Sequence, residues 1–247
     1  MKTNSTEETK NFYKKLIKGE IQRNILGVDK RFNAEYISKK DNVEKFFIKK
    51  IKKYISTEDR ILDLGCGTGG FSLAISPYCK ELICVDILQE FVDLTKNLLE
   101  RNNVKNAKTI FQSDKNIPLK DNYFNCILMV DVIHHVEDIN HLLKEISRVL
   151  RPGGKVLIFE PNKINPVIYL MHLFDPNERG LLRLGTPNIY KKILYNHLNS
   201  TTVEFSGLVV GPNNKILLNI SNFLSSKKIY FLLGWLLPKI FIFAVKK

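Results

Sequence analysis

The fold is decided by residues 60–70, which read RILDLGCGTGG. The apolar run 60–64 predicts a short strand, the glycines that follow predict a tight turn, and residues 69–78 predict a helix. Glycines let the backbone approach a ligand closely, and the helix directs its positive N-terminal end at the same point. The stretch therefore predicts a strand–loop–helix unit that binds a nucleoside-containing cofactor.

The same alternation continues to about residue 160. Further strands are predicted at 82–86, 109–111, 124–130 and 155–159, and helices at 88–102 and 139–150, with Asp138 as the N-cap of the last helix and a tight turn at 151–154. Strands that are apolar on both faces and alternate with helices predict an α/β fold. We expect an open, mostly parallel, Rossmann-like sheet with helices on both faces.

The flanking segments differ from this central part. Residues 1–55 predict two polar-faced helices and no strand, which we interpret as an N-terminal helical lid. Residues 56–247 form the cofactor-binding domain, with helical insertions at about 161–200 and 213–237. Two β-branched or apolar stretches, 201–210 and 239–245, predict the last strands.

The chain carries a net charge of +13, mostly from lysine. Arginine, whose fork matches phosphate geometry, is the commoner choice on selected phosphate-binding surfaces. The densest cluster lies on a predicted helix whose other face is apolar (Val43, Phe46, Phe47, Ile51), so we interpret it as a solvated face. Contact with RNA or with an anionic membrane stays open for this cluster, which comprises Lys45, Lys49, Lys50, Lys52 and Lys53.

Composition excludes several classes of protein. With 44% hydrophobic and 26% charged residues, the chain is typical of globular proteins. The opening MKTNSTEETK is no signal peptide, and the most apolar stretch, 229–245, is interrupted by Pro238 and Lys239, so a cytoplasmic protein without a transmembrane helix is expected. The cysteines (Cys66, Cys79, Cys84, Cys126) lack the spacing of a disulfide framework or a zinc site, and no metal is expected.

The glycine loop by itself is compatible with two cofactor classes. Gly65, Gly67 and Gly70 also satisfy the dinucleotide spacing, and Asp86 at the end of the next strand suits a ribose in either class. Asp63 would lie awkwardly beside a pyrophosphate but is well placed for an ammonium group, which favours a cationic cofactor. A short-chain dehydrogenase also needs a Tyr-x-x-x-Lys pair after the loop, whereas the pair Tyr36 and Lys40 precedes it.

Five segments in register resemble the class I S-adenosylmethionine-dependent methyltransferases, in particular their small-molecule, type 11-like branch. The resemblance covers roughly residues 55–160. Its segments are 62–69 (LDLGCGTG), 84–87 (CVDI), 112–114 (QSD), 124–127 (FNCI, with Asn125 where the family usually has Asp), and the pair 133–136 (IHHV) and 150–154 (LRPGG).

The resemblance implies the cofactor S-adenosyl-L-methionine, a seven-stranded sheet with the last strand antiparallel, and no metal. It places His135 near the transferred methyl group. We expect His135 or His134 to act as a general base; the alternative is that one of the two histidines only holds the loop by hydrogen bonds. His141, His172 and His197 are expected to be surface or structural residues. The cofactor-binding residues that it implies are Asp63, Gly65, Cys66, Gly67, Gly69, Asp86, Ile87, Asp114, Lys115 and Val130.

The acceptor is the least determined part. The fourth strand ends in Val130-Asp131-Val132-Ile133 rather than an Asn-Pro-Pro-aromatic box, which argues against base amino methylation and leaves oxygen, carbon and other nitrogens open. The resemblance implies a pocket built from residues 1–55 and the insertions, including residues 159–162. The apolar stretch 216–237 predicts either a packed lid or contact with a lipid-linked acceptor or a membrane surface. We expect a small or lipid-like acceptor, with an RNA-modifying enzyme as the alternative.

Overall fold

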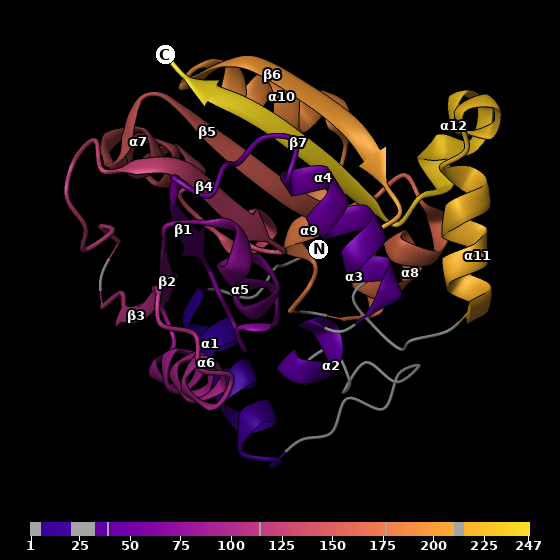
Figure 1. Cartoon of the computed structure of the whole chain (residues 1–247). Coiled ribbons are helices and arrows are strands. Elements are labelled where there is room, and N and C mark those ends of the chain that lie inside the picture. The colour runs from indigo at the N-terminus through magenta and orange to yellow at the C-terminus, as the bar shows by residue number, and fades with distance from the viewer. Residues whose placement is uncertain (1–5, 21–32, 39, 114, 176, 210–214) are drawn as a thin grey trace.

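The computed structural model describes residues 6–20, 33–38, 40–113, 115–175, 177–209 and 215–247. It contains a seven-stranded sheet in the order β3-β2-β1-β4-β5-β7-β6 (Figure 1). The strands are β1 (Arg60–Leu64), β2 (Glu81–Asp86), β3 (Ala107–Phe111), β4 (Phe124–Val130), β5 (Leu150–Pro161), β6 (Leu198–Ser206) and β7 (Lys239–Lys246). Strands β1 to β5 pair in parallel, whereas β7 is antiparallel to both β5 and β6. The predicted sheet, with its last strand antiparallel, is confirmed.

Helices cover both faces of this sheet, as predicted. One face packs on α7 (Ile139–Val149) and α10 (Pro187–Tyr195), and the other packs on α5 (Gly70–Ile75), α6 (Gln89–Arg101) and the segment 37–51. Because both faces are covered, β4 is apolar except for Asn125, with Cys126 to Met129 fully buried. The Asp138 side chain accepts a hydrogen bond from the backbone N–H of His141, which confirms it as the N-cap of α7.

The N-terminal part is helical, as predicted, but more broken. It comprises α1 (Thr6–Ile17), α2 (Ala34–Ser38), α3 (Asp41–Val43), a π-helical turn (Glu44–Ile48) and α4 (Lys49–Ile51). Val43, Phe47 and Ile51 are fully buried. Of the lysine cluster, Lys50 is half-buried beside Glu204, and the other four lysines are exposed. Exposure is what a solvated face requires, and contact with RNA or a membrane stays open for this cluster.

The insertions add further helices around the end of the sheet. The first holds α8 (Pro166–Phe174) and α9 (Gly180–Arg183) before α10, and the second holds α11 (Lys215–Leu224), α12 (Lys227–Leu233) and a 3-10 turn (Gly234–Leu236). Figure 1 shows α8, α11 and α12 gathered at one side of the molecule, away from α6 and α7.

The segment 151–154 differs from the prediction. It does not form a turn before β5 but lies inside that strand, where the pairing with β4 shifts register between Phe124 and Cys126. Gly153 adopts a φ of 70°, a backbone conformation that glycine tolerates and most residues do not. The glycines therefore form a bulge, and β5 begins earlier than its apolar run indicates.

Candidate active site

A cavity of about 1870 Å³ lies at the carboxyl ends of β1, β2 and β4. Open α/β sheets bind ligands at this edge. The walls continue from the glycine loop to α1, α8 and α11, so that residues from both flanking segments enclose it. Pockets for one drug-sized ligand hold roughly 300–1,000 Å³. The cavity is therefore large enough for a nucleoside cofactor and a second molecule.

The glycine loop has the backbone that its sequence predicts. Gly65, Gly67 and Gly69 adopt φ values of 78°, 55° and 82°. A Cβ on Gly65 would lie 2.5 Å from the side chain of Val132, so this position has no room for a side chain. Asp86 fixes the loop, because its carboxylate accepts hydrogen bonds from the N–H of Gly67 at 2.9 Å and of Leu88 at 3.0 Å.

Two buried carboxylates stand beside the loop. Burial raises the pKa of Asp63 to about 7, against the hydrogen bond that the Ser72 hydroxyl donates to it at 2.5 Å. Burial likewise raises the pKa of Asp86 to about 6, although the backbone amides of Gly67 and Leu88 oppose this rise. A ligand with a positive charge and hydroxyl donors would stabilise the ionised form of both groups. This arrangement suits an ammonium group and a ribose.

Most residues predicted to bind the cofactor lie on the cavity wall. The predicted catalytic residue His135 lies there too. The predicted cofactor-binding residues on the wall are Asp63, Gly65, Cys66, Gly67, Asp86, Ile87, Lys115 and Val130. Gly69 is not on the wall; its Cα faces Thr95, where a Cβ would lie 2.8 Å from the hydroxyl oxygen. Asp114 lies outside the described residues. The binding roles of all these residues stay predictions.

His134, the second predicted catalytic residue, is buried and does not line the cavity. Its Nδ1 lies 2.6 Å from Glu160 Oε2, and its Nε2 lies 3.2 Å from Glu178 Oε2. Burial alone would lower the pKa of His134, but the charges and hydrogen bonds of Glu160 and Glu178 outweigh it and raise this pKa to about 10. These contacts fit the alternative that one histidine of the pair holds the loop.

His135 faces the cavity instead. Its Nε2 lies 3.8 Å from Glu178 Oε2, and its ring meets that of Tyr13 edge-on, with 6.0 Å between the centroids. The Tyr13 hydroxyl, on α1, donates to Glu178 Oε1 at 3.3 Å. Residues from α1, from the loop after β4 and from the first insertion thus converge on one carboxylate.

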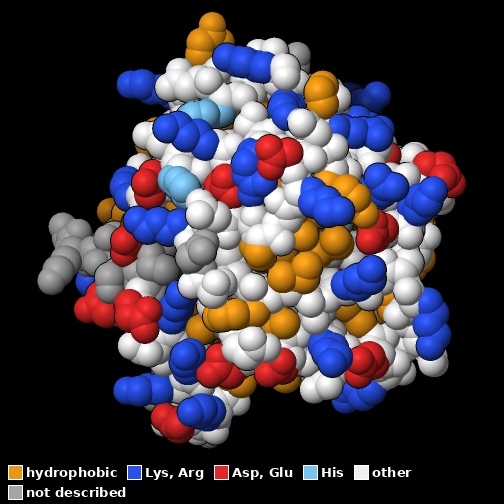
Figure 2. Space-filling model, turned by 90° about the vertical axis from the view of Figure 1, so that its left-hand side faces the viewer, with side chains coloured by type: hydrophobic (Ala, Val, Ile, Leu, Met, Phe, Trp, Pro, Cys, Tyr) orange, Lys and Arg blue, Asp and Glu red, His pale blue; other side chains and the backbone are white. Residues whose placement is uncertain are grey.

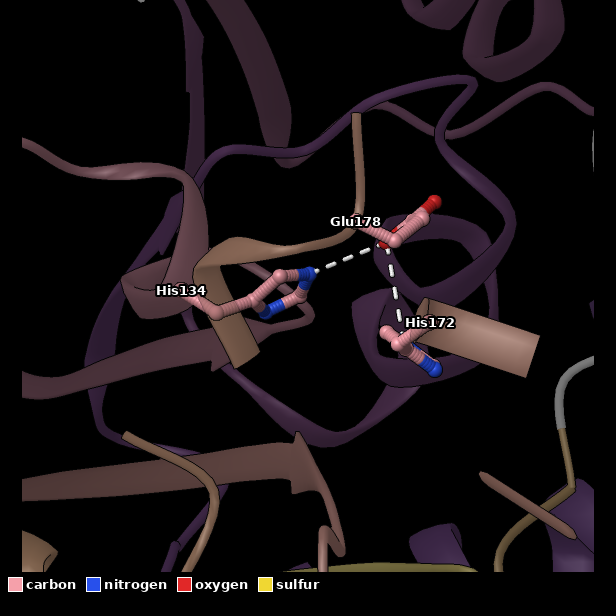
Figure 3. Close-up of side chains that lie close together, drawn as sticks. All are labelled: His134, His172 and Glu178. Carbon is pink, nitrogen blue, oxygen red and sulfur yellow. Dashed lines mark hydrogen bonds and ion pairs between the residues drawn. The ribbon is translucent and has the colours of Figure 1, made fainter. Parts of the chain in front are cut away.

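Sequence reasoning missed this convergence. Figure 3 shows Glu178 between His134 and His172, and His172, expected to be a surface or structural residue, is buried with its Nε2 3.8 Å from Glu178 Oε2. Glu160, expected to line the acceptor pocket, is fully buried under the loop and is not on the cavity wall. Glu178 lies in an irregular insertion whose sequence has no period, so no pattern indicated it.

Comparison with known proteins agrees with this geometry. A family model described as "Methyltransferase domain" matches residues 62–158. A demethylmenaquinone methyltransferase of Lactobacillus johnsonii is 30% identical over 187 residues, which cover 72% of this chain and 73% of that protein. The chain belongs to the S-adenosylmethionine-dependent methyltransferases.

Two further proteins resemble this chain, one in part of its sequence and one in fold. The uncharacterized methyltransferase YcgJ of Bacillus subtilis is 32% identical over 103 residues, which are 42% of this chain and 41% of that protein. The match thus spans less than half of YcgJ. A methyltransferase structure from Aquifex aeolicus has the same fold, with a TM-score of 0.61 and 16% identity over 88% of this chain and 98% of that one. The enzyme uses S-adenosyl-L-methionine as its cofactor.

The elevated pKa of Asp63 predicts a pH-dependent effect of Asp63→Asn. The folded protein holds this proton more tightly than the unfolded chain does, so the stability that Asp63 contributes below about pH 4 is lost as the pH rises through about 7. The variant escapes this loss. Without cofactor, the free energy of unfolding of Asp63→Asn, relative to that of the wild type, should therefore increase by a few kcal/mol as the pH rises from 4 to 8.

Thermal unfolding of the cofactor-free proteins across this pH range measures the difference. Asp93→Asn, a change at an exposed aspartate on α6, is the matched control and should show no such trend. A gap between Asp63→Asn and wild type that stays constant with pH would contradict the burial argument.

Proposed function

We propose that this methyltransferase acts on a lipophilic small molecule that occupies the outer part of the cavity. The observation that carries the proposal is the continuity of the cavity, which runs from the glycine loop to apolar residues of α8 and α11. These include Val167, Ile168, Met171, Leu217, Ile220 and Phe223. The relative from Lactobacillus johnsonii is named for a quinone acceptor, which supports an acceptor of this class.

The inner part of the cavity fits S-adenosylmethionine. Asp63 would hold its ammonium group, Asp86 its ribose hydroxyls, and Ile87 and Val130 would pack against its base. When bound, the cofactor supplies a methyl group on a sulfonium. The nucleophile of the acceptor would attack the methyl carbon directly, and the sulfur would leave as a neutral thioether. The main task of the protein is therefore alignment, and positioning of this kind contributes roughly 7–11 kcal/mol.

His135 is our proposed base for an acceptor that must lose a proton. It lies on the cavity wall, and Glu178 is close enough to stabilise the imidazolium that forms. Residues 1–55 would act as a lid, because Glu7, Lys10 and Tyr13 of α1 line the same cavity. The methylated atom depends on the acceptor, whose class the labelling experiment described below identifies.

The outer helices present an unusual surface for an enzyme of small polar molecules. Among the described residues, large exposed hydrophobic side chains cluster in 164–174 and 216–235, where Phe231 is 90% and Phe174 75% exposed. In the part of the chain that the structure describes, only four such side chains lie elsewhere (Ile87, Leu94, Phe111, Tyr195). Apolar patches of this kind mark interaction sites.

The charges on these helices indicate what the patch meets. Residues 161–174 and 205–247 contain no aspartate or glutamate, whereas Lys215, Lys227 and Lys228 are exposed. By contrast, the face in Figure 2, on the side of α6 and α7, carries acidic and basic side chains intermixed around apolar ones. Amphipathic helices with lysines and exposed aromatic residues bind anionic lipid surfaces. We therefore place α8, α11 and α12 against such a surface, from which a lipophilic acceptor would enter the cavity.

No helix within the described residues is long and apolar enough to cross a bilayer. The proposed contact is accordingly peripheral.

Methyl-labelled S-adenosylmethionine identifies the acceptor class. The purified protein is incubated with an extract of the source organism, which is then separated into organic-soluble, aqueous small-molecule and RNA fractions. We expect label in the organic-soluble fraction, and none with Asp86→Ala, which removes the carboxylate that fixes the glycine loop. Label confined to RNA would support the RNA-modifying alternative, and label confined to polar small molecules would contradict a lipophilic acceptor.

Vesicle flotation tests the lipid surface. The full chain should float with vesicles of phosphatidylcholine and phosphatidylglycerol, and the double variant Phe231→Glu, Leu232→Glu should bind them at least about tenfold more weakly because burying one such side chain contributes about 1.5–3 kcal/mol. Tyr195→Glu, at a side chain 76% exposed but remote in sequence from the patch, is the matched control. Equal flotation of all three proteins, or of none, would contradict the assignment.

Substitution of His135 tests its role in proton transfer. With the acceptor fraction identified above, His135→Gln should lower kcat by about 10²- to 10⁴-fold and leave cofactor affinity unchanged, since general-base catalysis contributes that much. His197→Gln, at a histidine that is not on the cavity wall, is the control. A wild-type kcat in His135→Gln would leave this residue a structural role only.

A further inference from the structure

Three side chains bring atoms that can ligate a metal to one point beside the cavity. His134 Nε2 lies 3.2 Å and His172 Nε2 lies 3.8 Å from Glu178 Oε2, and one ligand atom from each residue lies within 4.8 Å of the other two (Figure 3). Zinc–nitrogen and zinc–oxygen bonds of about 2.0–2.2 Å place tetrahedral ligands roughly 3–4 Å apart. The donors therefore need only small shifts to enclose a metal ion.

The other ring nitrogen of each histidine is already fixed. His172 Nδ1 lies 2.8 Å from the carbonyl oxygen of Ile168. A carbonyl only accepts hydrogen bonds, so Nδ1 carries the proton and Nε2 is left to act as a ligand. His134 Nδ1 is held by Glu160, which also accepts the N–H groups of Val132 and Ile133 at 2.8 Å. A carboxylate or carbonyl behind each imidazole is the usual support of metal-binding histidines.

The third donor is brought to the histidines by close packing of the chain. Gly180, at the start of α9, lies so near the loop after β4 that a Cβ there would be 1.7 Å from the carbonyl oxygen of His134. Only a glycine permits this approach, and it carries Glu178, two residues earlier, to within hydrogen-bonding distance of His134. The geometry is thus fixed by the backbone.

Charge and access also fit a cation. Glu160 and Glu178 are two buried carboxylates, and without a metal the imidazolium of His134, whose pKa they raise to about 10, supplies one compensating positive charge. A divalent cation would take the place of the Nε2 proton of His134 and bring two positive charges to the same carboxylates. His172 and Glu178 line the cavity, whereas His134 stands behind them. A metal held by these three residues would therefore have an open coordination position on the cavity side, as catalytic sites do.

We propose that His134, His172 and Glu178 bind one divalent transition-metal ion on the wall of the acceptor cavity. Two imidazoles and one carboxylate suit zinc, iron and related first-row ions better than magnesium or calcium. The ion would hold an oxygen of the acceptor next to His135 and polarise it. This role rests on the proposed function, whereas the binding of the metal does not. No metal was expected from the sequence, because the cysteines lack the spacing of a zinc site and the family resemblance implies none. The three ligands proposed here lie on separate segments with no motif spacing.

Zinc binding to the full chain tests the site without cofactor or acceptor. Protein treated with a chelator and then dialysed against zinc should hold one ion per chain. His172→Gln and Glu178→Gln should each weaken binding by at least about 100-fold, beyond the 10- to 100-fold that loss of a supporting partner costs. His141→Gln, a change at another histidine of the cavity wall, is the matched control and should bind zinc as the wild type does.

Cobalt(II) in place of zinc reports the ligands by its absorption spectrum. We expect the visible bands of nitrogen and oxygen coordination, lost in His172→Gln, and no thiolate charge-transfer band. Circular dichroism checks that each variant is folded. If Glu178→Gln does not fold, the result for His172→Gln alone tests the site. Absence of stoichiometric zinc in the wild type, wild-type affinity in folded variants, or a thiolate spectrum would each overturn the proposal. Because no methyl transfer is measured, failure of the proposed function would leave this result intact.

Discussion

The site depends on one buried carboxylate, that of Glu160 at the end of β5. It is fully buried and accepts the N–H groups of Val132 and Ile133, while His134 Nδ1 lies 2.6 Å away and the Tyr190 hydroxyl 3.4 Å away. Burial alone would raise the pKa of Glu160, but His134 and the two amides outweigh it and lower this pKa, so the group stays ionised. Through these bonds β5 and α10 fix the loop that follows β4.

That loop sets the rest of the site. With His134 turned inward to Glu160, its neighbour His135 faces the cavity, and Val132 closes on Gly65 of the glycine loop. The second end of His134 positions Glu178, and Glu178 in turn lies near Tyr13 on α1. Cofactor loop, proposed base, first insertion and N-terminal helix are therefore coupled through a single chain of polar contacts. Such networks hold one geometry when every member is satisfied.

The sequence predicted the sheet well because its strands are buried on both faces. β4 is apolar except for Asn125 and was predicted to the residue, whereas β5 extends through the glycine bulge, since its pairing with β4 and not its hydrophobicity defines where it begins. The cofactor loop was also predictable, because its glycines and Asp86 are contiguous with β1 and β2. The cluster around Glu178 was not, because contacts between residues far apart in sequence leave no local period. The one local trace of it is Gly180, whose close approach to the loop after β4 brings Glu178 to His134.

The cavity keeps apolar and ionisable side chains apart along its length. Its outer walls on α8 and α11 are mostly apolar, so they favour entry of a lipophilic molecule but do not orient it. Its inner end holds the ionisable groups of Asp63, Asp86, His135 and Glu178, which are costly to bury and are retained where charge must be handled. A long apolar acceptor can satisfy both only in one orientation, with its polar end inward. The segregation of the walls would therefore present the reacting atom of the proposed lipophilic acceptor to the cofactor before any specific contact with the acceptor is made.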